Sequence, residues 1–142
     1  MDDNLKIEIN CIRLSTAFYR ALDENLDRKV LAYFSANGIW HRAGKPVKAG
    51  EELATALNKR SATRRVRHVL TNVMVDCEST VNAKVFAYLT VYESDSGVAV
   101  QGPMDMPTPK MLGRIEMALA QEVGEWKITE LRTLPDFTKP AV

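Results

Sequence analysis

The sequence predicts an α+β fold in which helices come first and antiparallel strands follow. In the first 60 residues, apolar side chains recur at helical spacing. After residue 66 they gather instead in β-branched and aromatic runs separated by turn residues, which is typical of strands. The stretch QGPMDMPTP, residues 101–109, holds three prolines and predicts a loop. Because 142 residues is a usual domain size, we expect residues 1–142 to form a single domain.

Three helices are expected. Residues 5–25 keep apolar or small side chains on one stripe without Gly or Pro, so they predict a long and largely buried first helix. A short second helix is expected at about residues 27–34, after the polar segment DENLD. The segment AGEELATALNKR, residues 49–60, predicts the third helix, with acidic residues in the first turn, where the helix dipole favours them.

The strands begin with NGIW, residues 37–40, in a strand that should end near Arg42. Further strands are expected at residues 66–77, 84–92, 111–123 and 126–134, separated by the turns ESTVN, SDSG and VGE. A curved sheet of these strands must cover its apolar face with the long first helix, and this arrangement makes a cone.

Composition excludes several classes of protein. The chain has 19 Lys and Arg against 18 Asp and Glu, so no overall charge draws it to nucleic acid or to a membrane. Cys11 and Cys77 form no CxxC motif, the two histidines make no recognisable metal site, and the seven glycines form no phosphate-binding loop. We therefore expect no metal and no cofactor. No secretory signal or membrane span is evident, which predicts a cytoplasmic protein.

Three segments, FYRALDENLDRKVLAYF, RHVLTNVMVD and GEWKITELRTLPDF, resemble the SnoaL-like branch of the nuclear transport factor 2-like superfamily. The resemblance covers nearly the whole chain and implies a cone-shaped, curved antiparallel sheet wrapped around the N-terminal helix, the cystatin-like arrangement. Relatives include ketosteroid isomerases, scytalone dehydratase, a dehydrochlorinase, a bile acid dehydratase, polyketide cyclases and the non-catalytic β subunits of ring-hydroxylating dioxygenases. The fold alone therefore does not select a function.

Asp23 and His68 are the first candidate site residues. In the scytalone dehydratase-like and dehydrochlorinase-like relatives, an aspartate near the end of the first helix pairs with a histidine that opens a following strand, and the resemblance places Asp23 and His68 at these positions. Tyr19 lies four residues before Asp23 on the same helix face. The alternatives are that His68 is a satisfied core residue and that Asp23 caps a helix or belongs to a solvated turn.

Such a pair has a defined chemistry. A carboxylate fixes the imidazole tautomer and supports the imidazolium, so His68 could remove a proton beside a carbonyl or opposite a leaving group. Arg132 is the candidate for stabilising the negative charge that develops, and the resemblance to the bile acid dehydratase also places a working arginine on this closing strand. The alternative for Arg132 is an ion pair with Glu130 at the rim of the sheet.

Five other residues are candidates for the substrate-binding wall. Strict alternation along residues 66–74 puts Asn72 and Met74 on the same face as His68. Along residues 85–92 it puts Tyr88 and Tyr92 on one face of the next strand. The five candidates are Trp40, Asn72, Met74, Tyr88 and Tyr92. The second histidine that scytalone dehydratase carries on the tyrosine strand is absent, which disfavours that particular substrate. Arg64, Arg65 and Arg67 are interpreted as a solvated rim or an oligomer contact.

Together these features predict a small cofactor-independent lyase or isomerase that holds a small hydrophobic, carbonyl-bearing molecule in the cone. The alternative is a non-catalytic ligand-binding or assembly module resembling the dioxygenase β subunits. A ligand-sized cavity at His68 and Asp23 would favour the enzyme, whereas a cone filled with side chains would favour the module. Because the strands are apolar on both faces, we also expect a homodimer or homotrimer.

Overall fold

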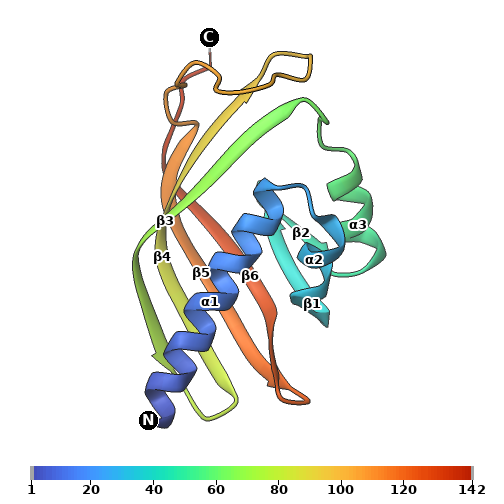
Figure 1. The fold of residues 1–142 in the computed structure, drawn as a ribbon. Coiled ribbons are helices and arrows are strands. Elements are labelled where there is room, and N and C mark those ends of the chain that lie inside the picture. Colours follow the sequence, from blue (N-terminus) through green and yellow to red (C-terminus); the bar gives the residue numbers. More distant parts are fainter. Residues whose placement is uncertain (1, 142) are drawn as a thin grey trace.

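The computed structural model describes residues 2–141 and folds them into three helices and one six-stranded sheet (Figure 1). The helices are α1 (Asp3–Asp23), α2 (Asp27–Ala32) and α3 (Glu51–Asn58). The strands are β1 (Phe34–Arg42), β2 (Lys45–Lys48), β3 (Arg64–Cys77), β4 (Asn82–Asp95), β5 (Met111–Glu122) and β6 (Glu125–Thr138). The α+β class predicted from the sequence is confirmed.

The sheet has the strand order β2-β1-β6-β5-β4-β3. Neighbouring strands are antiparallel except for β1 and β6, which run parallel. The strand pairing therefore departs in one place from the fully antiparallel sheet that the sequence predicts. Strand β2 also lies outside that prediction: it is a short edge strand that follows β1 through a turn at Ala43 and Gly44, whose φ values of 50° and 79° suit a tight hairpin.

Helix α1 lies across the sheet, and the long strands curve around it (Figure 1). Its buried side chains recur at helical spacing and include Ile7, Cys11, Phe18, Tyr19 and Leu22. They pack on the inner face of the sheet, where β4 contributes Ala83, Val85, Ala87, Leu89 and Val91 at every second position. The last turn of α1 thereby comes to lie over the start of β3, next to His68.

A β-bulge in β3 reverses which residues face inward. Thr71 pairs with Tyr88 and Met74 pairs with Phe86, so β3 has one more residue than β4 in this interval. Asn72 adopts a φ of 54°, in the left-handed region that asparagine tolerates better than most residues. Beyond the bulge, Asn72 and Met74 are exposed, with Met74 at 69%. The prediction that they share the face of His68 is therefore wrong.

The tyrosines of β4 also point away from the inner face. Because Ala87, Leu89 and Val91 are buried, the residues that alternate with them face outward, and Tyr88 is 49% exposed. Tyr92 lines a separate groove of ≈ 350 Å³ together with Met104 and Met106 from the loop between β4 and β5. The structure therefore does not bring Tyr88 and Tyr92 to His68, and their predicted place in the same binding wall is wrong.

The outward face of the sheet exposes several large apolar side chains: Val69, Met74, Phe86, Tyr88, Leu112 and Phe137. We propose that this face meets a second copy of the chain in a homodimer or homotrimer, because a soluble monomer rarely exposes so many neighbouring apolar groups. Sedimentation equilibrium at micromolar concentration should show the oligomer, and Tyr88→Glu should shift it toward the monomer. Arg13→Glu on the exposed side of α1 is the control, and a monomeric parent protein would contradict the proposal.

None of the helices within residues 2–141 combines the length and the apolar composition that crossing a membrane requires.

Candidate active site

Asp23 and His68 form the centre of the candidate site. Asp23 is the last residue of α1, and its Oδ1 lies 2.5 Å from His68 Nδ1. The backbone N–H of His68 donates to the other carboxylate oxygen, Oδ2, at 3.0 Å. Both side chains are largely buried, with 13% of His68 and 8% of Asp23 exposed. One carboxylate thus holds both the ring and the backbone of His68, and the contact expected from the sequence is present.

This contact determines which nitrogen of His68 is available. A carboxylate can only accept hydrogen bonds, so we assign the ring proton to Nδ1, where it donates to Asp23. The other nitrogen, Nε2, then carries a lone pair, and within residues 2–141 no hydrogen bond engages it. His68 also lines a cleft of ≈ 460 Å³. Nε2 is therefore available to a molecule bound in the cleft.

The cleft has an apolar wall and lies between the end of α1 and the inner sheet face. The wall comprises Leu22, Trp40, Val66, Val91 and Met111. Trp40 packs edge-on against Phe18 with their ring centroids 5.3 Å apart, and its ring stacks near Phe34 at 6.1 Å. These contacts hold the indole rigidly. Trp40 is thus the one predicted wall residue that lines the same cleft as His68.

Tyr19 lies beside His68 with a buried and unpaired hydroxyl. The two ring centroids are 5.2 Å apart, and Tyr19 is only 3% exposed. No group of residues 2–141 forms a hydrogen bond with its Oη atom. Burial, and secondly the charge of Asp23, raises the pKa of Tyr19 well above its usual value, so the phenol stays protonated. Tyr19 is not among the residues that line the cleft, so its hydroxyl is a buried donor without a partner, a state that costs about 1–3 kcal/mol.

Arg132 does not reach the cleft. Its Nε donates to Glu130 Oε1 at 3.1 Å, and its side chain is 45% exposed. The cause is a second register shift, where Leu119 pairs with Ile128 but Ala118 pairs with Glu130. The shift makes both Ile128 and Leu131 face inward and turns Arg132 outward. The prediction that Arg132 stabilises charge at His68 is therefore wrong, and the alternative ion pair is what the structure contains.

Charged residues that the sequence did not single out line the cleft instead, and Arg42 and Lys110 are two of them. Arg42, at the end of β1, places its guanidinium carbon 4.8 Å from the centre of the Trp40 ring. Lys110, just before β5, lies 2.5 Å from Glu93, whose other carboxylate oxygen is 3.0 Å from Arg64. Arg42 could have been noticed in the sequence, because it directly follows Trp40 and His41 at the end of an expected strand. Nothing in the sequence showed that this strand end lies near His68, which is 26 residues further along the chain.

Glu93 is held ionised by its cationic neighbours. Burial alone would raise its pKa, but the hydrogen bond and charge of Lys110, together with Arg64, outweigh burial and lower the pKa of Glu93 below its ordinary value. Glu93 therefore stays a carboxylate in the cleft at neutral pH and offsets part of the positive charge there.

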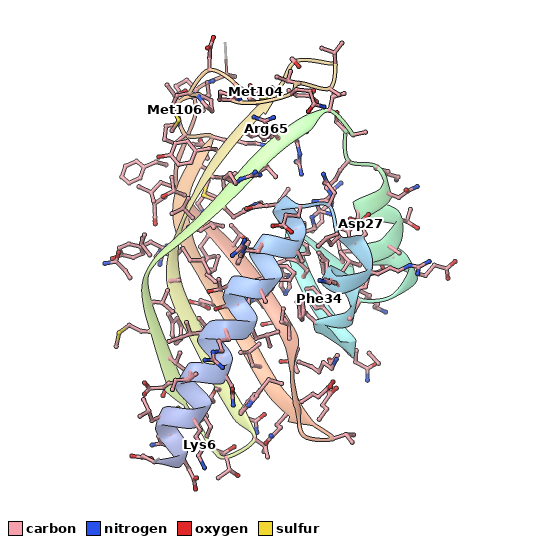
Figure 2. All side chains as sticks on the ribbon, viewed as in Figure 1. Lys6, Asp27, Phe34, Arg65, Met104 and Met106 are labelled. Atoms are coloured by element: carbon pink, nitrogen blue, oxygen red, sulfur yellow. The ribbon has the colours of Figure 1, made fainter. Side chains whose placement is uncertain are left out.

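The three arginines of the RRVR segment have different roles. Arg64 faces the cleft and pairs with Glu93. Arg65 donates to the carbonyls of Val100 and Gly102 at 3.1 and 2.9 Å, and so ties the loop between β4 and β5 to β3. Figure 2 shows Arg65 directly beneath the part of this loop that carries Met104 and Met106. Arg67 donates to the carbonyl of Val66 at 2.7 Å. Within residues 2–141, no three His, Cys, Asp or Glu side chains gather so that they could hold a metal ion.

Comparisons with known proteins agree with this fold. A family model described as the SnoaL-like domain matches residues 4–132. No curated protein matches the chain in a sequence search. Among solved structures, a protein of Novosphingobium aromaticivorans with a provisional scytalone dehydratase assignment has a TM-score of 0.81 at 16% identity, covering 97% of this chain and 89% of that one.

Two further structures are similar over nearly their whole length. ActVI-ORFA from Streptomyces coelicolor has a TM-score of 0.74 at 15% identity, covering 94% of this chain and 98% of that one. A protein of unknown function with a cystatin-like fold from Nostoc punctiforme has a TM-score of 0.69 at 17% identity, covering 90% of each chain. At such identities the likeness establishes the shared fold, and the activity has to be argued from the site.

Proposed function

Since this chain belongs to the family of SnoaL-like domains, we propose that it is a small cofactor-independent lyase or isomerase acting on an apolar cyclic molecule that bears a carbonyl group. The observation that carries the proposal is the Asp23–His68 pair, which leaves Nε2 without a hydrogen bond in a histidine that lines a cleft of ≈ 460 Å³. A cleft of this size with an apolar wall suits a ligand of one to three rings. It also favours the enzyme over the non-catalytic module, for which the cone should be filled.

The proposed reaction begins with proton abstraction. Nε2 of His68 takes a proton from the carbon beside the substrate carbonyl, and the electron pair of the broken C–H bond moves onto the carbonyl oxygen. Asp23 stabilises the imidazolium through Nδ1–H. The electron pair then returns from the oxygen and expels a hydroxide or halide from the next carbon. In a dehydration, the imidazolium returns its proton to the departing hydroxide, which leaves as water.

The same steps permit isomerisation. If the imidazolium hands its proton to a different carbon of the enolate, the double bond moves and no group leaves. Both outcomes need a donor for the oxygen that gains charge. The Tyr19 phenol suits this task because it is protonated, lies beside His68 and has no other partner within residues 2–141. Because Tyr19 itself does not line the cleft, we assign it the role of hydrogen-bond donor to the substrate oxygen through one water.

The reaction can be tested without knowledge of the natural substrate. Cyclic ketones with a hydroxyl or halogen two carbons from the carbonyl should form the conjugated enone, followed by its ultraviolet absorbance. In D₂O, the protons beside the carbonyl should exchange faster with the protein than with buffer, as measured by NMR. If neither elimination nor exchange exceeds the buffer rate across steroid, naphthalenone and cyclohexanone probes, the proton-abstraction function is rejected in favour of the binding module.

Tyr19→Phe should separate catalysis from stability. The substitution removes a buried hydroxyl that has no hydrogen-bond partner within residues 2–141, so thermal unfolding should occur at the same or a higher temperature. Turnover should nevertheless fall by about 10- to 100-fold, because the oxygen that gains charge loses a donor. Unchanged turnover in the folded variant would remove Tyr19 from the mechanism. Tyr33→Phe provides the matched control, because within residues 2–141 the ring that lies beside His68 is that of Tyr19 and not that of Tyr33.

A further inference from the structure

The cleft at His68 has more positive than negative side chains on its walls. Within residues 2–141, its lining includes one carboxylate, Glu93, and five basic side chains: Arg42, Arg60, Arg64, Lys110 and Lys139. The function proposed above, proton abstraction from an apolar ketone, does not by itself require this excess. The excess positive charge therefore suits a negatively charged group on the bound molecule.

Most of these cations already have partners inside the protein. Arg60 is only 7% exposed and pairs with Asp27 at 2.8 Å, so its charge is compensated by a structural contact. Arg64 and Lys110 share the single carboxylate of Glu93, at 3.0 and 2.5 Å. The single negative charge of Glu93 cannot neutralise both cations, so a net positive charge remains in this part of the cleft.

Within residues 2–141, Arg42 and Lys139 have no such partner, and of these two Arg42 is the one that lies against an aromatic ring. Its half-buried guanidinium carbon lies 4.8 Å from the centre of the Trp40 ring, and within residues 2–141 it forms no ion pair and no side-chain hydrogen bond. Stacking on an indole fixes the plane of the guanidinium while leaving its N–H groups free. Burial, followed by the charges of Arg60 and Arg64, lowers the pKa of Arg42. A bound anion would offset the cost of burying the Arg42 charge and would weaken its repulsion by Arg60 and Arg64.

We propose that the substrate carries a carboxylate and that Arg42 binds it, with Arg64 and Lys110 adding charge. The inference rests on the proposed function, because it places this group in the same cleft as Nε2 of His68. The acid would anchor one end of the molecule and leave its ring against the apolar wall near Trp40. The substrate class is thereby narrowed from cyclic ketones to cyclic keto acids.

A carboxylate fits this cleft better than a phosphate group. Its planar pair of oxygens matches the guanidinium fork, and its single charge balances that of Arg42, which has no ion pair within residues 2–141. A doubly charged phosphate would also lie close to the Glu93 carboxylate, which stays ionised. Free phosphate and acetate are therefore included in the experiment as competing anions.

The test compares two probes of the same shape by calorimetric titration at neutral pH. The anion 2-naphthoate and the neutral 2-naphthamide differ only in the group offered to Arg42. The parent protein should bind 2-naphthoate about 10- to 100-fold more tightly, because a charge-assisted hydrogen bond is stronger than a neutral one. Arg42→Gln should abolish that preference while leaving 2-naphthamide binding within about two-fold.

Arg20→Gln is the matched control. It removes the same charge from an exposed position on α1, where Arg20 pairs only weakly with Glu24 at 3.8 Å, and both probes should bind as they do to the parent. Equal binding of the two probes to the parent protein would overturn the inference. It would also be overturned if Arg42→Gln weakened both probes equally, since Arg42 would then act by packing on Trp40, or if acetate or phosphate bound as tightly as 2-naphthoate.

Failure of this inference can be told apart from failure of the proposed function. His68→Gln should keep the preference for 2-naphthoate, since Arg42 remains, even though turnover is lost. If the parent protein shows no preference for 2-naphthoate but still catalyses elimination from neutral ketones, the proposed function is supported and the keto acid substrate is rejected. A preference for 2-naphthoate without any proton exchange would support anion binding and reject the lyase or isomerase.

Discussion

Replacing His68 with glutamine should lower turnover by about 10² to 10⁴, the usual contribution of a general base. The variant should still fold, because the glutamine amide can donate to Asp23 as the ring Nδ1–H does now and the backbone bond to Asp23 is unaffected. What is lost is the lone pair of Nε2 in the cleft. The measurement is the rate of enone formation, or of deuterium exchange beside the carbonyl, with circular dichroism to verify the fold.

His41 offers a matched control for this variant. It is the other histidine of the chain, and its Nε2 lies 3.4 Å from Glu130, outside the cleft. His41→Gln should therefore leave the rate within about two-fold, since a surface pair of this kind contributes little. If His68→Gln kept the parental rate, the base would have to be another group and the proposed mechanism would be abandoned.

Asp23→Asn should have an effect of similar size, about 10² to 10⁴ on turnover. The carboxylate now accepts two hydrogen bonds, one from the His68 ring and one from the His68 backbone. An asparagine has a single acceptor oxygen, and its NH₂ group must face the other site. When the oxygen keeps the backbone bond, the NH₂ donates to Nδ1, which places the ring proton on Nε2 and occupies the lone pair needed for catalysis.

The same variant should lose stability as well as activity. One of the two hydrogen bonds to Asp23 is weakened in a largely buried position, which costs about 1–3 kcal/mol in the free energy of unfolding measured in urea. Glu24→Gln is the control, because it neutralises the next residue, whose side chain is 53% exposed and pairs with Arg20. A fully active and fully stable Asp23→Asn protein would show that the carboxylate neither orients the ring nor stabilises the imidazolium.

The regular elements could be predicted because their signals are local. Helical spacing placed the first helix at residues 5–25, against Asp3–Asp23 in the structure, and the four long strands were placed within a few residues of β3, β4, β5 and β6. Strand β2 was missed because its four residues include a proline and form a strand only by pairing with β1.

Which side chains face inward could not be predicted along the whole of each strand. Alternation assigned Asn72 and Met74 to the face of His68, and the resemblance to the bile acid dehydratase supported a place for Arg132 in the site. Both assignments failed at a register shift, one near Asn72 and the other between Ile128 and Glu130. A bulge depends on how two strands match across a sheet, so a single extra residue reverses the faces without a strong signal in the strand itself.

The sequence by itself determined the order of the helices and strands, and its resemblance to known relatives led to the expected pairing of Asp23 with His68. Both predictions rest on local features, because each pattern or matching position lies within one continuous segment of the chain. The tertiary structure alone decided that Arg42, Arg64 and Lys110, rather than Arg132, stand around the cleft. Arg42 ends β1, Arg64 begins β3 and Lys110 directly precedes β5, and only the curvature and register of the sheet bring them together.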